Sequence, residues 1–445
     1  MTKSEVLSLA KEQKVKFINV MFTDLLGVMK ALTIPVSKLE DAIDSNVWFD
    51  GSSIEGFARI SESDMYLKLE LNTFTVIPWS KGSRAVTALI IADIYMPDGS
   101  PFEGDPRGIL KRQIKRATDA GYQFNTGPEL EFFLFKKSTD GSLAPLPHDK
   151  GGYFDQTTDL ASEIRKEMTF ALHELGIDVE ALHHEVAIGQ HEIDFKYDNA
   201  LRCADIVIIM KYALKSIAMQ YDLHCTFMPK PIAGINGSGM HVHQSLFSLD
   251  GKKNLMYDPD GEYQLSAIAK HYIAGQLKHI KAMNAILNPS VNSYKRLVVG
   301  YEAPVYVAWG QRNRSALIRI PRITKGREKA VRAELRCPDP TANPYLAFAV
   351  MLAAGLDGID NKLPAPAPVE ENIFEFTDET AAARGITTVA KSLLEALDEL
   401  QKDTVIRKAL GDFCVEKIVE AKTAEWDSYR MSVSQWELDR YLEVY

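Results

Sequence analysis

The segment Gly127-Pro-Glu-Leu-Glu-Phe-Phe-Leu-Phe135 has the composition of a β-strand and carries two carboxylates at alternate positions. Side chains two residues apart in a strand point to the same side of the sheet, so Glu129 and Glu131 share one face. A solvated face is the usual explanation of such a pair. These glutamates, however, lie beside three phenylalanines, where an unpaired carboxylate is costly. The segment therefore predicts a strand whose carboxylates meet something cationic.

Two later segments repeat this alternation of ionic side chains. In Gly239-Met-His-Val-His-Gln244, His241 and His243 share a face, and in Arg332-Ala-Glu-Leu-Arg336, Glu334 shares a face with two arginines. Taken singly, the first could be an edge pair of histidines without a ligand, and the second a ladder of surface ion pairs. The recurrence of the pattern in three predicted strands favours one common site.

A further carboxylate pair, Glu185 and Glu192, lies within His183-His-Glu-Val-Ala-Ile-Gly-Gln-His-Glu-Ile-Asp194. The break at Gly189-Gln190 predicts a hairpin that could bring the two glutamates together. Five glutamates and one histidine then form a hard-oxygen ligand set, which suits Mg²⁺ or Mn²⁺ and lacks the thiolates of a structural zinc site. Two divalent ions are natural partners of phosphoryl transfer, because they neutralise charge on the oxygens that are exchanged.

The residues that bind phosphate are less obvious. No G-x-x-x-x-G-K-[ST] segment is present, which argues against a P-loop ATPase. The segment Gly234-Ile-Asn-Gly-Ser-Gly239 differs from the dinucleotide fingerprint, and its glycines could instead let a substrate approach the backbone closely. The arginines after it form either a solvated basic face or the partners of anionic substrates opposite the carboxylates. They are Arg296, Arg312, Arg314, Arg319, Arg322, Arg327, Arg332 and Arg336.

Turn, cap and hydrophobic patterns predict a β-rich first part of the chain and an α/β remainder. Strands are expected at residues 15–23, 28–34, 64–71, 74–79 and 85–95, with a short helix from a Ser37 cap to Asp44. Asp105 and Pro106 begin the next helix, and others are expected at residues 159–175, 200–221, 263–287 and 343–354. Because the loop 96–104 is rich in Pro and Gly, we expect two domains, 1–104 and 105–445.

Bulk properties are those of a globular protein with an ordinary core. The 445 residues include 51 Lys and Arg against 60 Asp and Glu, and no block of like charge suggests a nucleic-acid surface. Four scattered cysteines without a C-x-x-C pair are typical of reduced, buried thiols. The N-terminus has no signal-peptide core and no apolar stretch reaches membrane length, so a cytoplasmic location without membrane contact is expected.

Along essentially its whole length the chain resembles class I glutamine synthetase. The matching segments are Trp48-Phe-Asp-Gly-Ser-Ser53, residues 127–132, residues 236–243, residues 296–302, Arg312-Asn-Arg-Ser315 and residues 332–343. The resemblance implies an α+β fold with a small N-terminal β-grasp-like domain and a large C-terminal α/β catalytic domain that contains a curved antiparallel sheet. It also implies a homo-oligomer, a dodecamer of two face-to-face hexameric rings, with active sites between neighbouring subunits.

The resemblance further implies a set of ligand-binding residues. One metal ion would be held by Glu131, Glu185 and Glu192, and the other by Glu129, His241 and Glu334. ATP would contact Glu180, Tyr197, His243, Ser245, Lys329 and Arg332. Glutamate would be bound by Asn236, Gly237, Arg296 and Arg336, and the transferred phosphate by Arg314 and Arg319. Asp50 from the adjacent subunit, Glu302 on a flap and the nearby Tyr153 would form the ammonium site.

The expected chemistry follows from these roles. The γ-carboxylate of glutamate would attack the γ-phosphate of ATP to give an acyl phosphate, while metal ions and arginines offset the negative charges. Asp50 would attract NH₄⁺ and take a proton from it, which releases ammonia as the nucleophile. The flap that carries Glu302 would exclude water, which would otherwise hydrolyse the intermediate.

Departures from the family pattern bear on regulation. The short segment after Pro368 does not match the stretch that carries the adenylylated tyrosine of one bacterial subclass. The chain is closer to the short, feedback-regulated subclass, in which an arginine at the position of Arg59 takes part in inhibition by glutamine; a solvated surface arginine is the alternative. The C-terminal residues 436–445 would contact the opposite ring and nitrogen-responsive transcription regulators, or form an ordinary terminal helix on their own subunit.

Three other functions compete with glutamine synthesis. A γ-glutamyl-polyamine ligase would use an amine in place of ammonia, but Asp50, Tyr153 and Glu302 match the ammonium site. A non-catalytic regulatory oligomer would show gaps in the metal and arginine set, and the sequence has none. A carboxylate-rich metal-storage protein would not need Arg296, Arg314, Arg319 and Arg336.

Overall fold

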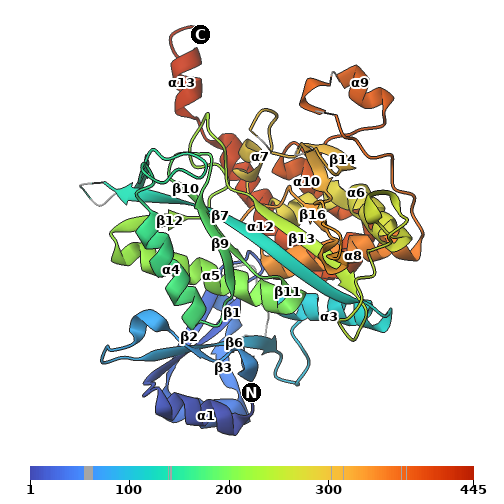
Figure 1. The fold of residues 1–445 in the computed structure, drawn as a ribbon. Coiled ribbons are helices and arrows are strands. Elements are labelled where there is room, and N and C mark those ends of the chain that lie inside the picture. Colours follow the sequence, from blue (N-terminus) through green and yellow to red (C-terminus); the bar gives the residue numbers. More distant parts are fainter. Residues whose placement is uncertain are drawn as a thin grey trace.

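A computed structural model describes residues 1–54, 64–138, 140, 143–301, 303–313, 315–371, 373–376 and 378–445. It has a small N-terminal sheet and a larger sheet surrounded by helices, with the N-terminal part at the bottom of Figure 1. The N-terminal sheet has the order β2-β1-β6-β4-β3, with β5 also on β6. Its strands are β1 Phe17–Thr23, β2 Met29–Pro35, β3 Val47–Asp50, β4 Asp64–Leu69, β5 Thr75–Val76 and β6 Thr87–Tyr95. Only the β1–β6 pair among them is parallel, so these described strands form a mixed sheet.

The central strands β1 and β6 of the N-terminal sheet are buried on both faces, because apolar residues at successive positions point to opposite faces. Ile18 and Val20 of β1 face a cluster that includes Val6 of helix α1 (Lys3–Glu12) and Leu39 of helix α2 (Leu39–Ser45). Met21 of β1 belongs instead to the main core of the molecule. The sheet therefore packs on its own two helices with one face and on the rest of the chain with the other.

The larger sheet is built around the long strand β7 (Gln123–Lys137). Its order is β14-β15-β16-β13-β7-β10-β9, with β8, β11 and β12 also paired to β7. All its pairs among the described residues are antiparallel except β14 with β15. The other strands are β8 Leu143–Pro147, β9 Val179–His184, β10 Gln190–Phe195, β11 Asp198–Asn199, β12 Leu223–Thr226, β13 Met240–Phe247, β14 Tyr306–Gly310, β15 Ala316–Arg319 and β16 Ala333–Leu335.

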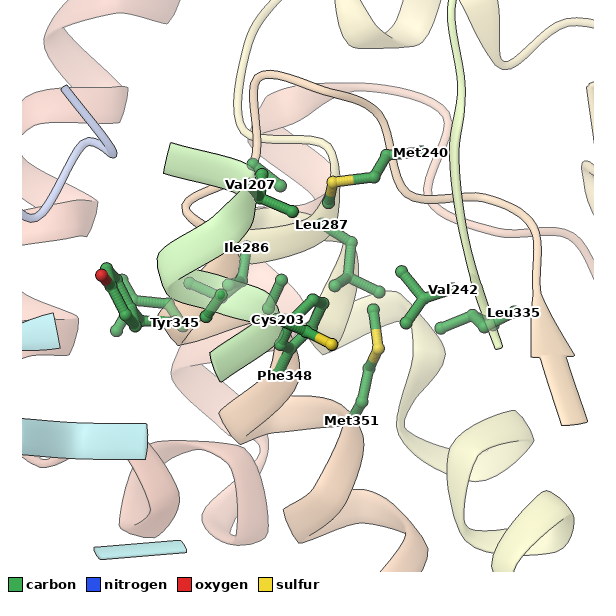
Figure 2. Packing of buried hydrophobic residues seen from close by; sticks show 14 of the residues in the cluster. Cys203, Val207, Met240, Val242, Ile286, Leu287, Leu335, Tyr345, Phe348 and Met351 are labelled. Carbon is green, nitrogen blue, oxygen red and sulfur yellow. The ribbon is translucent and has the colours of Figure 1, made fainter. Parts of the chain in front are cut away.

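Helices α5 (Ala200–Gln220), α6 (Ala267–Leu287) and α8 (Pro344–Asp360) form the centre of the main core. Figure 2 shows Val207 of α5, Phe348 of α8 and Leu287 of α6 packed towards Val242 and Leu335 of the sheet. The other helices are α3 Pro106–Asp119, α4 Ser162–Glu174, α7 Ser293–Arg296, α9 Asp378–Ala383, α10 Leu393–Lys402, α11 Thr404–Leu410, α12 Asp412–Met431 and α13 Gln435–Tyr441. Short 3₁₀ turns lie at Val36–Lys38, Gly51–Ser53, Leu71–Thr73, Pro78–Ser80, Glu262–Gln264, Glu328–Ala330 and Ile373–Glu375.

The four cysteines, Cys203, Cys225, Cys337 and Cys414, are buried and unpaired, and burial raises the pKa of each thiol to about 12. This agrees with the reduced thiols expected from the sequence. Among the described residues, no helix has both the length and the apolarity needed to cross a membrane.

Several helix boundaries differ from those predicted. Helix α1 was not expected, although a Thr2–Glu5 capping box begins it. Ser37 does not cap α2, which follows a 3₁₀ turn and starts after Lys38 without a side-chain cap. Asp159 lies before α4 and binds Arg165 instead of capping the helix. Residues 263–266 precede α6, because Ser266 rather than Tyr263 provides the cap.

The predicted end of α8 at Ala354 was too early, and the reason is close helix packing. Gly355 and Gly358, which follow the predicted end, lie inside the helix, which continues to Asp360. A Cβ on Gly358 would lie 2.0 Å from the carbonyl oxygen of His271, and one on Gly275 of α6 would lie 2.0 Å from that of Ala354. The glycines therefore allow the backbones of α6 and α8 to touch.

A buried ionic network joins the N-terminal sheet to the core. Arg107, in the first turn of α3, donates to Asp93 of β6 at 2.7 Å and to both carboxylate oxygens of Asp205 in α5 at 2.9 and 3.0 Å. Tyr345 of α8 donates to the same Asp205 at 2.7 Å. Burial and the nearby Asp93 raise the pKa of Asp105, the cap of α3, to about 7. One arginine thus ties three separate elements together at the junction.

Replacing Gly275 by Ala should lower the free energy of unfolding by about 2–3 kcal/mol, because the added methyl forces α6 and α8 apart. Denaturant-induced unfolding at matched protein concentration measures this change. Gly152→Ala is the control, since a Cβ there meets only Asp155 Oδ2 at 3.6 Å. Equal midpoints for the two variants would show that the helix contact is not tight.

Candidate functional site

The register of four strands brings the predicted ionic residues together. Glu129 of β7 lies opposite His241 of β13, and Glu131 lies opposite Glu192 of β10. On the other side of β13, Glu334 of β16 lies opposite His243. Strands distant in sequence therefore place their ionic faces on one side of one sheet.

The first ligand cluster consists of Glu129, His241 and Glu334, whose ligand atoms all lie within 4.8 Å of one another. His241 Nδ1 lies 3.2 Å from Glu129 Oε2, and His243 Nε2 lies 2.7 Å from Glu129 Oε1. Glu334 is 1% exposed and is paired with Arg319 at 2.8 Å and Arg336 at 3.1 Å. This set is the one that the resemblance assigns to one metal ion.

The second cluster consists of His183, Glu185 and Glu192, within the same 4.8 Å limit. His183 Nε2 lies 3.1 Å from Glu192 Oε2. Glu131, which the sequence analysis assigned to this ion, lies beside the cluster and accepts hydrogen bonds from Gln190 Nε2 and the backbone N–H of Gly239, both at 2.9 Å. His183 was not predicted, although it is two residues from Glu185 and the same alternation rule applies to it.

Burial and mutual repulsion destabilise the ionised form of most of these carboxylates. Burial and the neighbouring Glu185 raise the pKa of Glu131 to about 8, and burial and Asp194 raise that of Glu192 well above its usual range. Burial and Glu129 likewise raise the pKa of Asp194 to about 7. At Glu129, burial is outweighed by hydrogen bonds from His241 and His243, which hold its pKa well below the usual range. Such a group of carboxylates fits a divalent cation, which would favour the ionised form of each.

A third cluster of Asp149, His184 and His191 has similar spacing but does not fit a metal ion. Arg165 Nη1 lies 2.8 Å from His191 Nδ1, and because arginine can only donate, that nitrogen accepts. The proton of neutral His191 is then on Nε2, which leaves no lone pair for a metal. His184 and Asp149 instead form a buried pair at 2.9 Å that supports the β9–β10 hairpin.

The first two clusters line a cavity of about 320 Å³, here called the carboxylate cleft. Besides the metal-ligand candidates, it is lined by the residues predicted for glutamate, phosphate and ammonium: Tyr153, Asn236, Gly237, Arg296, Arg319 and Arg336. Arg296 is 4% exposed and donates to the backbone carbonyls of Cys337 and Pro338. The ion pairs of the described residues do not include Arg296, so its positive charge is available to an anion in the cleft.

Two glycines allow this arginine to reach the cleft. A Cβ on Gly239 would lie 2.5 Å from Arg296 Nη2, and one on Gly237 would lie 2.2 Å from the carbonyl oxygen of Pro229. From the sequence, these glycines could let a substrate approach the backbone closely. The close approaches seen here are made by the protein's own atoms.

An adjoining cavity of about 330 Å³, here called the Tyr197 cleft, shares Glu129 and Asp194 with the first. It is lined by all the residues predicted for ATP: Glu180, Tyr197, His243, Ser245, Lys329 and Arg332. Arg332 Nε donates to His243 Nδ1 at 3.0 Å, and His243 in turn bonds Glu129. Asp194, which the sequence analysis did not single out, lines both cavities.

Four predicted residues are not brought to these clefts by the described part of the chain. Asp50 lies at the end of β3, where its carboxylate accepts from Ser52 N at 2.8 Å, and it lines neither cavity. Hydrogen bonds from Ser52 lower its pKa, so it is an anion at neutral pH. Arg59, Glu302 and Arg314 lie outside the described residues.

Comparison with known proteins identifies the family. A family model described as the glutamine synthetase beta-grasp domain matches residues 14–97, and one described as the glutamine synthetase catalytic domain matches residues 103–441. The chain belongs to the glutamine synthetase family. The predicted family, its fold class and its enzymatic nature are thereby confirmed, and the polyamine ligase and regulatory oligomer are not favoured.

Relatives named glutamine synthetase align over the entire chain. One from Methanosarcina mazei is 51% identical over 444 residues, covering 100% of this chain and 98% of the relative. One from Thermus thermophilus is 52% identical over 448 residues, covering 100% and 99%. Among solved structures, a GmaS–ADP complex has a TM-score of 0.88 at 32% identity, covering 98% of this chain and 99% of the other. A cryo-EM structure of Plasmodium falciparum glutamine synthetase has a TM-score of 0.87 at 27% identity, covering 99% of both.

Thermal stabilisation by Mg²⁺ should be larger at pH 8 than at pH 6. Folding raises the pKa of Glu131 from 4.5 to about 8, so its contribution to stability is present below pH 4.5 and is lost as pH rises towards 8. A divalent ion needs the ionised carboxylate, so it binds better as that proton leaves. The midpoint of thermal unfolding with and without Mg²⁺ at each pH measures the effect.

In Glu131→Gln, the rise in the midpoint of thermal unfolding that Mg²⁺ causes should depend less on pH. The matched control is Glu163→Gln, because the Glu163 side chain is 82% exposed on α4. If Mg²⁺ raises the unfolding midpoint of the unaltered protein by the same amount at both pH values, this account of the cleft is wrong.

Proposed function

We propose that the two adjoining clefts carry out the ATP-dependent ligation of ammonia to the γ-carboxylate of L-glutamate, giving L-glutamine, ADP and phosphate. The observation that carries this proposal is the junction at Glu129, which lines both the carboxylate cleft and the Tyr197 cleft. A nucleotide in one cleft and an amino acid in the other would meet there, next to the metal-ligand candidates. The enzyme is an ATP-dependent ligase of glutamine biosynthesis and so of nitrogen assimilation.

The Tyr197 cleft is proposed to hold ATP through Glu180, Tyr197, His243, Ser245, Lys329 and Arg332. Lys329 and Arg332 supply positive charge for phosphates, and the GmaS structure of the same fold was solved as an ADP complex. At least two Mg²⁺ or Mn²⁺ ions, held by Glu131, Glu185 and Glu192 and by Glu129, His241 and Glu334, would neutralise charge on the transferred phosphate. His183 is added here as a candidate ligand beside Glu185.

Glutamate is proposed to bind in the carboxylate cleft through Asn236, Gly237, Arg296 and Arg336. Arg296 is in none of the ion pairs of the described residues, and its buried guanidinium would bind the substrate's carboxylate through charge-assisted hydrogen bonds. Arg319, together with Arg314, is proposed to steady the phosphate as the γ-carboxylate attacks it and γ-glutamyl phosphate forms. Arg319 is paired with Glu334 at 2.8 Å. If Glu334 binds a metal ion instead, the Arg319 guanidinium becomes available to the phosphate.

The ammonium site is proposed to form between subunits from Asp50, Glu302 and Tyr153. In support, Asp50 lies in the N-terminal sheet and not in either cleft of its own chain, while Tyr153 is 47% exposed at the edge of the carboxylate cleft. Asp50 would attract NH₄⁺ and accept its proton. We further propose a dodecamer of two hexameric rings, domains at residues 1–104 and 105–445, and contact of the exposed helix α13 with another subunit or a transcription regulator.

The test is formation of glutamine from glutamate, ammonium, ATP and Mg²⁺, measured beside the same reaction with putrescine in place of ammonium. We expect glutamine with little polyamine product, because an anionic Asp50 beside Tyr153 suits a small cation. Turnover with putrescine alone would transfer the protein to the polyamine ligases. No turnover with either substrate by a folded, assembled protein would favour the regulatory oligomer.

Feedback inhibition is proposed to act through Arg59 and Glu302. Glutamine should inhibit the unaltered enzyme, and Arg59→Ala should reduce that inhibition, since a lost charge-assisted hydrogen bond typically weakens binding about tenfold or more. Initial rates at increasing glutamine concentration give the inhibition constant, and Arg84→Ala, an exposed arginine of the same domain, is the control. Unchanged glutamine sensitivity in Arg59→Ala would rule out this role.

A further inference from the structure

Lys230 is a buried cation behind the carboxylate cleft. Its residue is 8% exposed, and the ion pairs of the described residues do not include it. Burial and the nearby Arg296 lower the pKa of its ammonium group. A buried ammonium without a carboxylate partner is costly, so its other contacts must compensate for the lost solvation.

Those contacts join two separate segments. The ammonium donates to the backbone carbonyl of Ile235, and it lies 3.9 Å from the centre of the Tyr301 ring. A cation within about 6 Å of an aromatic face is attracted by the ring, and more strongly when desolvated. Lys230 therefore holds Ile235 and Tyr301 with the same charged group.

The position of Lys230 is itself fixed from a third segment. Its backbone N–H donates to Asn292 Oδ1 at 2.8 Å, and its carbonyl accepts from Asn292 Nδ2 at 3.0 Å. Its side-chain Cδ lies 3.3 Å from where a Cβ of Gly237 would be, so its stem packs against that glycine. The lysine thus has little freedom to move away from its two partners.

Two of the segments that Lys230 contacts supply residues to the proposed glutamate site, and the third lines the same cleft. Ile235 directly precedes Asn236 and Gly237, and Asn292 directly precedes helix α7, which ends at Arg296. Tyr301 lines the carboxylate cleft and directly precedes Glu302. Lys230 itself does not line the cleft, so it acts on a ligand there only through these neighbours.

We infer that Lys230 is the positioning residue of the glutamate site, joining the Asn236–Gly237 loop to Tyr301 through its ammonium contacts. This inference rests on the proposed roles of Asn236, Gly237 and Arg296. Glutamate in the cleft would meet a loop and a tyrosine whose relative placement is already set, which lowers the entropy lost on binding. The other cleft, in which ATP is proposed to bind, is not lined by Lys230.

A purely structural lysine would give a different result from a positioning one. Loss of a purely structural contact lowers stability and impairs the binding of both substrates or of neither. Loss of a positioning contact weakens the binding of glutamate and leaves the binding of ATP unchanged. The contact with Tyr301 also predicts coupling between the two residues, because either change removes the same cation–ring interaction.

The experiment compares Lys230→Met, Tyr301→Leu, the double variant and Tyr301→Phe in the full chain. Glutamate affinity in the presence of ADP and Mg²⁺ is measured by calorimetry, and KM for glutamate and for ATP by glutamine formation. Lys230→Met and Tyr301→Leu should each lower the affinity for glutamate about tenfold and leave the KM for ATP unchanged. The double variant should bind glutamate no more weakly than the single variants do. Tyr301→Phe keeps the ring, so it should weaken glutamate binding less than Tyr301→Leu does.

Lys215→Met is the matched control, since Lys215 also lies over a ring, 5.7 Å from that of Phe227, but lines neither cleft. The inference would be overturned if Lys230→Met had unchanged affinity for glutamate. It would also be overturned if the fold-loss of affinity in the double variant were the product of those in the two single variants. If Lys230→Met does not fold, equal affinities of Tyr301→Leu and Tyr301→Phe would overturn it. An unaltered protein that neither binds glutamate nor makes glutamine would defeat the proposed function, and this inference with it.

Discussion

Glu129, Glu131, Glu192 and Asp194 lie opposite one another on the neighbouring strands β7 and β10, and the charge of these four carboxylates must be met by cations. Part of the stabilisation comes from the sheet itself, because His241 and His243 on β13 hydrogen-bond Glu129 from the other side of β7. In the order β16-β13-β7-β10, the anionic faces of β7 and β10 are thus adjacent, and the histidines of β13 border them on one side. Every other feature of the site is arranged around this row.

The same row explains why the two clefts adjoin. Glu129 lies in the middle of the sheet, so the space on one side of it becomes the carboxylate cleft and the space on the other becomes the Tyr197 cleft. His243 connects the two, since one ring nitrogen bonds Glu129 and the other accepts from Arg332. Phosphoryl transfer between ligands in the two clefts would therefore occur above the residues that hold the charge.

Local sequence signals predicted which side chains share a strand face better than where the helices end. Alternation in a strand is set by the backbone itself, so the pairs at Glu129 and Glu131 or His241 and His243 could be assigned to one face without knowing the fold. Helix boundaries depend on competition between caps and on tertiary packing. Asp159 is a good cap in isolation but binds Arg165, and the glycines of α8 resemble a helix end but serve its contact with α6.

The sequence by itself determined which residues carry charge, which of them share a strand face, and, by family resemblance, the family. Tertiary structure alone decided which faces meet. The register of β7 with β10 and β13 placed Glu192 beside Glu131 and His241 beside Glu129, and it brought His183 and Asp194 into the site. It also placed Lys230 between Ile235 and Tyr301. Contacts between residues far apart in the chain depend on long-range packing, which local periodicity does not encode.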